Sequence, residues 1–404
     1  MYTQSLKSIA MKYKLVLTFC FLISMFFTRA QTGALRINAN IVLPKDTAVS
    51  KALIASLNDF LTAARRPNEE NLFIWDAERI ETYILLDEIN GIEKSGRYKD
   101  DLFYKPYLMN AAPLKDSEYF LQISYIGMHD DIPLLRACFE LVAHRHNSSF
   151  LFSSPLIRNT KGWKKEEIGR NVFHYQASLN KASAKRYTRL AASFDSKLNS
   201  KNKVSEFYCC ENIIELQKLI GISYKSDYNG KAESMWASKL GNKKLIVAGN
   251  NNASFNEFDE HDLWHERLGL VIPRSQVNNP VDEGCAYLYG GSWGLPWKDI
   301  FTAFYRQIAA DKQVNWCAVK ESPVFFKTKG IDNSADYIIN ALLVQKIERE
   351  KGFAGVWELL NCGKAEQGNK NYYTALERLT GITKADYNAK GWELIAAEKK
   401  KLKL

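Results

Sequence analysis

Residues 258–268 have the sequence FDEHDLWHERL, and the interpretation of the second half of the chain depends on this stretch. His261 and His265 are four residues apart, so on a helix both imidazole rings project from one face and can reach the same ion. Neutral imidazole is a good zinc ligand, and a catalytic zinc site typically has three protein ligands and one position for water. A histidine pair with this spacing is more often an ordinary helix surface, so the interpretation requires a third ligand.

Glu283 is the candidate for that third ligand. Seventeen residues separate it from His265, and it opens a second helical segment, VDEGCAYLY at 281–289. A carboxylate is a common partner of two histidines in zinc sites. The sequence therefore predicts a Zn²⁺ site formed by His261, His265 and Glu283.

Other carboxylates near these residues leave alternatives open. Asp259 and Glu260 are rival ligands by position, although three residues at a suitable spacing already suffice. Glu266 and Asp282 stand directly beside the predicted ligands, and we expect them to face solvent or to orient the histidines through hydrogen bonds.

Both segments resemble the gluzincin, or peptidase MA-like, zinc metallopeptidases, in which HExxH is followed about eighteen residues later by an EGxA-type segment. This chain has HDLWH at 261–265 and EGCA at 283–286. Three further stretches, 205–222, 335–360 and 372–394, are similar to the family's strand, helices and terminal helices, so the resemblance covers about 180–395. It implies a mostly helical zincin-like domain over 180–404 that hydrolyses peptide bonds, with zinc held by His261, His265 and Glu283.

The chain departs from the family pattern at the general base. Asp262 stands where the family has glutamate, so its carboxylate is one methylene shorter. A shift of about 1 Å in a catalytic group can reduce the rate ~10²-fold. The resemblance also implies a tyrosine or histidine that stabilises the transition state, and Tyr337 is the candidate. The catalytic residues are thus expected to be Asp262 and Tyr337.

The first thirty residues predict an export signal. Lys12 and Lys14 precede an apolar run of thirteen residues, 15–27, which is followed by small residues up to Ala30. Such a run covers roughly 20 Å as a helix, too short for a ~30 Å hydrocarbon core. We therefore expect a cleaved signal peptide over 1–30, a secreted or periplasmic protein, and no stable membrane insertion after cleavage. Six of the seven cysteines remain after residue 30 and could form disulfides in an oxidising compartment.

Residues 31–179 predict an α+β domain. Apolar residues recur at helical spacing over 47–64 and 76–92, and β-rich runs follow at 119–127, 134–144, 149–154 and 171–177. Helices followed by a meander suggest a sheet curled around a helix, and the order is similar to the cystatin-like or nuclear-transport-factor-like cone. The fold class of the chain is thus α+β.

Charge argues against a nucleic-acid partner. The formal net charge is +10, and four positive charges, Lys7, Lys12, Lys14 and Arg29, lie in the predicted signal, which leaves +6 for the rest. That excess is modest for a chain of this length, and the basic C-terminal residues are expected to form a solvated helix end. The predicted partner is a peptide or protein substrate.

Two functions follow from these patterns. The first is a secreted zinc-dependent peptidase, in which zinc activates water and Asp262 accepts its proton. The alternative is a catalytically weak or inactive binding protein of the periplasm or cell surface that keeps the zincin scaffold.

Overall fold

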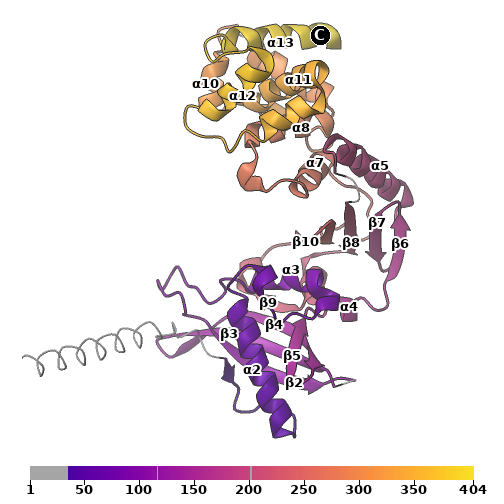
Figure 1. The fold of residues 1–404 in the computed structure, drawn as a ribbon, viewed down its shortest axis with the longest axis vertical. Coiled ribbons are helices and arrows are strands. Elements are labelled where there is room, and N and C mark those ends of the chain that lie inside the picture. Colours follow the sequence, from indigo (N-terminus) through magenta and orange to yellow (C-terminus); the bar gives the residue numbers. More distant parts are fainter. Residues whose placement is uncertain (1–34, 116, 201–202, 311) are drawn as a thin grey trace, which may run out of the picture. The chain divides into compact units, whose positions relative to one another are not determined.

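The computed structural model describes residues 35–404 except 116, 201–202 and 311 (Figure 1). The predicted signal peptide at 1–30 lies outside the described residues. Among the helices described, none is both long and apolar enough to cross a membrane. The chain divides into two compact units: one contains the residues up to Gly162 and Ile213–Ser234, and the other contains Trp163–Asn212 and Met235–Leu404.

The first unit is a sheet with helices packed on it. Its strands follow the order β1 (Arg36–Ile37), β2 (Lys105–Pro113), β3 (Tyr119–His129), β4 (Ile132–His146) and β5 (Ser149–Ser153), and β9 (Ile222–Lys225) pairs with β4. Strands β2 to β5 form an antiparallel meander. The helices are α2 (Thr47–Ala63), α3 (Arg79–Ile89), α4 (Leu156–Asn159) and α6 (Ile213–Ile220).

Helix α2 lies across this sheet (Figure 1), as the predicted helix-and-meander order requires. The Asp46 side chain caps it by accepting hydrogen bonds from the backbone N–H groups of Ala48 and Val49. The segment 76–92, predicted as one helix, begins with a 3₁₀ turn at Asp76–Glu78, and its α-helix, α3, covers Arg79–Ile89.

The second unit contains a five-stranded sheet with the order β10-β11-β8-β7-β6. These strands are β6 (Lys164–Ile168), β7 (Asn171–Tyr175), β8 (Val204–Cys210), β10 (Ser234–Leu240) and β11 (Lys243–Gly249). Strand β8 is parallel to both β7 and β11. Strand β10 lies at the edge, and the helix α5 (Lys181–Lys197) connects β7 to β8.

Two segments pair with a different sheet from the one expected. The run at 171–177 was assigned to the N-terminal domain, but β7 pairs with β8 of the second unit. Residues 222–225 lie in the part of the chain assigned to the C-terminal domain, but β9 pairs with β4 of the first unit. Hydrophobic period identifies a strand but not its partner, because the hydrogen bonds form between residues far apart in sequence.

Helices predominate after residue 250, in the later part of the domain over 180–404 that was expected to be mostly helical. They are α7 (Glu260–Gly269), α8 (Asn279–Tyr289), α9 (Trp297–Phe304), α10 (Trp316–Glu321), α11 (Ala335–Leu360), α12 (Lys370–Thr380) and α13 (Tyr387–Leu402). A small hairpin, β12 (Phe325–Thr328) with β13 (Ile331–Ser334), precedes α11 and was not expected. Together the two units make the chain a mixed α and β protein.

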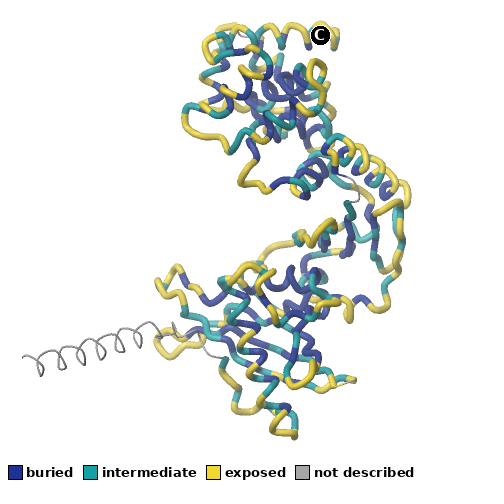
Figure 2. The backbone as a smooth tube through the Cα atoms, in the orientation of Figure 1, coloured by how far each residue is buried: buried dark blue, intermediate teal, exposed yellow. Residues whose placement is uncertain are grey.

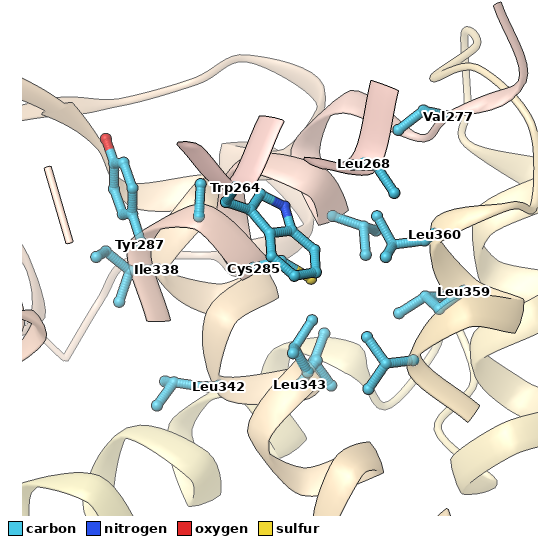
Figure 3. Close-up of a cluster of buried hydrophobic side chains, with 14 of the residues drawn as sticks. Trp264, Leu268, Val277, Cys285, Tyr287, Ile338, Leu342, Leu343, Leu359 and Leu360 are labelled. Carbon is cyan, nitrogen blue, oxygen red and sulfur yellow. The ribbon is translucent and has the colours of Figure 1, made fainter. Parts of the chain in front are cut away.

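The core of the second unit lies where α7, α8 and α11 meet. Trp264 is fully buried there among leucine side chains, including Leu343 and Leu360 (Figure 3). Both units show this pattern of buried interior and exposed surface (Figure 2). None of the six cysteines in the described part of the chain forms a disulfide.

Gly284 allows α8 to approach α11 closely. A Cβ at this position would lie 2.7 Å from the backbone nitrogen of Ala341 and 2.8 Å from the carbonyl carbon of Asn340. Real Cβ atoms do not make such contacts with backbone, so a side chain here would push the helices apart.

We expect Gly284→Ala to lower the free energy of unfolding by about 1–3 kcal/mol, because overpacking forces the two helices apart. Urea unfolding followed by circular dichroism measures the change. Gly269→Ala is the matched control, since Gly269 is also helical and a Cβ there has no neighbour within 4 Å. Equal stability of Gly284→Ala and the wild type would contradict the close packing.

Candidate metal centre

Helix α7 presents its two histidines to one point. The Asp259 side chain caps the helix by accepting a hydrogen bond of 2.8 Å from the backbone N–H of His261. The helix then places His261 and His265 on one face, where their Nε2 atoms are 3.1 Å apart. The sequence predicted this helix and this facing pair.

Glu283 on α8 completes a triangle of donor atoms. Its Oε2 lies 3.3 Å from Nε2 of His261 and 3.7 Å from Nε2 of His265. Ligand atoms that bind one tetrahedral zinc at about 2.0–2.1 Å lie about 3.3 Å apart. The three separations therefore fit an ion placed between these atoms. In the part of the chain that the structure describes, this is the one such grouping of histidine, cysteine or acidic side chains.

Hydrogen bonds behind the triangle fix the direction of each ring. Asp282 is 3% exposed, and its Oδ2 lies 2.9 Å from Nδ1 of His265 while its Oδ1 accepts a 2.9 Å hydrogen bond from Nε1 of Trp264. The backbone carbonyl of Gly291 lies 2.8 Å from Nδ1 of His261. Because each Nδ1 is held by an acceptor, each Nε2 is left to face the centre, as in histidines that bind metals.

The cluster holds protons where a cation would bind. Burial alone would raise the pKa of Glu283, but hydrogen bonds with His261 and His265 outweigh it and lower this pKa to about 2. Burial alone would lower the pKa of His265, but hydrogen bonds to Asp282 and Glu283 raise it to about 9. The raised pKa favours a protonated His265 at neutral pH, so an ion that binds here must displace that proton.

The remaining acidic residues of α7 have other partners. Glu260 forms an ion pair with Arg186, and Oε1 of Glu266 accepts hydrogen bonds of 2.7 Å from Tyr187 and Ser205. Asp259 is the helix cap described above. The structure therefore gives Asp259 and Glu260 local roles and places Asp282, beside Glu283, as the residue that orients a histidine.

Asp262 lies on the wall of a cleft of about 740 Å³ together with His265. The other walls come from the face of the five-stranded sheet, with Phe207 and Lys244, and from the edge strand, with Met235. Partial burial, followed by the charge of Asp259, raises the pKa of Asp262. Asp262 and the candidate ligand His265 thus line the same cleft.

Tyr337 occupies a different place from Asp262. Its half-buried ring packs against the Tyr287 ring at a centroid distance of 5.7 Å, and Tyr337 is not among the described residues that line the cleft. Burial, and then the charge of Glu283, raises its pKa. The ring of Tyr287 lies beside His261, with a distance of 5.6 Å between the two ring centroids. No pattern in the sequence indicated this neighbour. The role of Tyr337 remains a prediction.

A buried network joins the back of α7 to its surroundings. Arg267 is 0% exposed and donates hydrogen bonds of 2.8 and 2.6 Å to the two carboxylate oxygens of Asp195 on α5, and one of 2.8 Å to Ser205 on β8. No local pattern indicated these contacts, because the partners of Arg267 lie 72 and 62 positions away in the chain.

We expect Asp282→Asn to weaken zinc binding by about 10–100-fold. Asparagine has one oxygen and no charge, so it cannot accept hydrogen bonds from both Trp264 and His265 as the two oxygens of Asp282 do. Competition with a chromophoric chelator measures the affinity. Asp299→Asn is the control, since Asp299 lies on α9 and forms a surface ion pair with Lys329. An unchanged affinity in Asp282→Asn would remove the proposed orienting role.

A comparison of the chain with protein-family models and with curated proteins finds no match.

Proposed function

We propose that this protein is a zinc-dependent peptidase, exported to the periplasm or the outside of the cell. The observation that carries the proposal is the meeting of Nε2 of His261, Nε2 of His265 and Oε2 of Glu283 beside a cleft that also contains the Asp262 carboxylate. Two imidazoles and one carboxylate are a donor set that suits zinc and leaves one position open. Export is supported by the apolar run at 15–27 and the residues around it.

Bound zinc would polarise a substrate carbonyl and lower the pKa of its coordinated water. His261, His265 and Glu283 supply the positions that hold the ion, while Asp282 and the Gly291 carbonyl keep the two rings in place. The Asp262 carboxylate accepts the proton from the attacking water and can return it to the leaving amine. Its shorter side chain makes this transfer less effective than that of a glutamate at the same helical position.

The edge of the sheet supports an extended peptide as the substrate. Strand β10 has β11 as its neighbour on one side, and the other side is the end of the described sheet. An extended peptide can add to such an edge by backbone hydrogen bonds. Met235 of this strand lines the same cleft as His265, so a peptide paired with β10 would pass the metal centre.

A non-catalytic binding protein is the second candidate, and the shortened base favours it. The same metal centre would then order α7 and α8, and the cleft would hold a peptide without cleaving it. Metal analysis does not separate these two functions, so a comparison of variants at position 262 is required.

For the metal, we expect about one zinc per chain in the purified wild type, and a loss of it in His261→Ala because one of three ligands is gone. Elemental analysis of protein dialysed against a small excess of zinc measures the content. His146→Ala is the control, since His146 is an exposed residue of the first unit. A wild type that binds no zinc would contradict the proposal.

For the reaction, we expect Asp262→Ala to lower peptide hydrolysis by about 10²-fold and Asp262→Glu to raise it above the wild-type rate, because glutamate brings the carboxylate about 1 Å closer to the water. Cleavage of an internally quenched peptide library measures the rates. Equal activity of Asp262→Ala and the wild type would exclude the role of Asp262. Zinc binding without hydrolysis in the wild type and in Asp262→Glu would favour the binding protein.

A further inference from the structure

Trp293 occupies a tight turn that does not suit a tryptophan. Ser292 and Leu295 exchange two backbone hydrogen bonds, of 3.0 and 2.9 Å, so Trp293 and Gly294 are the two central residues of the turn. Both have positive φ, +48° for Trp293 and +73° for Gly294. Asparagine and glycine are preferred where two successive residues have positive φ, because other side chains strain the backbone in this conformation.

Burial does not offset this strain. Trp293 is 74% exposed, so most of the apolar surface of its side chain remains in water. Backbone strain of this kind is concentrated at ligand-binding sites, and the free ring surface is available for contact with a ligand.

The turn is attached directly to the metal centre. It follows Gly291, whose carbonyl holds Nδ1 of His261 at 2.8 Å. Gly290 lies against the start of α7, where a Cβ would come within 2.5 Å of the Glu260 carbonyl oxygen. The position of Trp293 is therefore fixed relative to the ligand His261 by two short contacts.

Two other apolar side chains line the cleft near its solvent-exposed surface. Met235 on the edge strand is 56% exposed, and Phe258 precedes α7. Trp293 lines the same cleft as these two residues and as Asp262 and His265. A flexible methionine beside fixed aromatic rings can adapt to apolar groups of different shape.

We infer that Trp293 determines the specificity of the cleft by packing on a large apolar side chain, aromatic or leucine, of the peptide presented to His261, His265 and Glu283. This inference rests on the proposed function, because it assigns the substrate class of the same site. Trp293 is a binding residue and takes no part in proton transfer.

The test uses Trp293→Asn, which removes the ring and places a preferred residue in the turn. Fluorescence anisotropy measures the binding of labelled hexapeptides with Phe, Leu or Ala at each position in turn. The zinc-loaded Asp262→Ala background is used because its expected loss of about 10²-fold in hydrolysis slows cleavage during the measurement. We expect peptides with Phe or Leu at one position to bind about tenfold more tightly than their Ala counterparts, and Trp293→Asn to abolish this difference.

Thermal unfolding of the same variants separates ligand binding from folding. Trp293→Asn should unfold at the same or a higher temperature than its parent, whereas Trp293→Phe should keep the preference for apolar peptides. Phe325→Asn is the control, since Phe325 is 64% exposed and does not line the cleft, and it should leave the preference unchanged.

The outcomes distinguish this inference from the proposed function. Zinc binding with an equal apolar preference in Trp293→Asn, or with no preference in the parent, overturns the inference and leaves the metal centre intact. Absence of zinc from the wild type overturns the proposed function. The same peptide series on the metal-free protein then decides the role of Trp293.

Discussion

One carboxylate connects the core of the second unit to its candidate metal centre. Asp282 accepts a hydrogen bond from the buried Trp264 indole with one oxygen and holds Nδ1 of His265 with the other. Since Trp264 and His265 are neighbours on α7 and Asp282 lies on α8, this group sets the register between the two helices. Glu283, the next residue on α8, then meets both histidines. The packing of α8 on α11, which depends on the small size of Gly284, supports the whole arrangement.

Local spacing was sufficient to predict that the three candidate ligand side chains meet. His261 and His265 share a helix, and Glu283 lies on the next one, so the period of a helix and one short connection relate all three. The groups that orient them were less accessible to this reasoning. The Gly291 acceptor is a backbone carbonyl, which no side-chain pattern reports, and no pattern indicated that the Tyr287 ring lies beside His261.

The fold shows the same division between local and distant information. The helices α2 and α3 and the meander of the first unit follow from periodicity. The pairing of β7 with β8 and of β9 with β4 does not, because it depends on contacts between segments that lie far apart in sequence.

A second hydrogen-bonded group, built around His144, shows that a reactive arrangement also requires access for a substrate. His144 lies between Glu118 and Ser153, with Nδ1 2.8 Å from the carboxylate and Nε2 2.9 Å from the hydroxyl. The arrangement has the order of a nucleophile relay, but Ser153 is 0% exposed and the imidazole stacks on Trp75. A substrate cannot reach such a hydroxyl. We therefore assign this cluster to the stability of the first unit, in contrast to the cleft beside His265.

Burial of cysteine side chains has a consequence for how the second unit reacts with oxidants. Burial raises the pKa of Cys209 to about 12 and that of Cys362 to about 11, and it also raises the pKa of the fully buried Cys285. Oxidation and disulfide exchange proceed through the thiolate, which is scarce at neutral pH when the pKa is this high. At neutral pH these three sulfurs are therefore mostly protonated, which slows their reaction with oxidants and with disulfides.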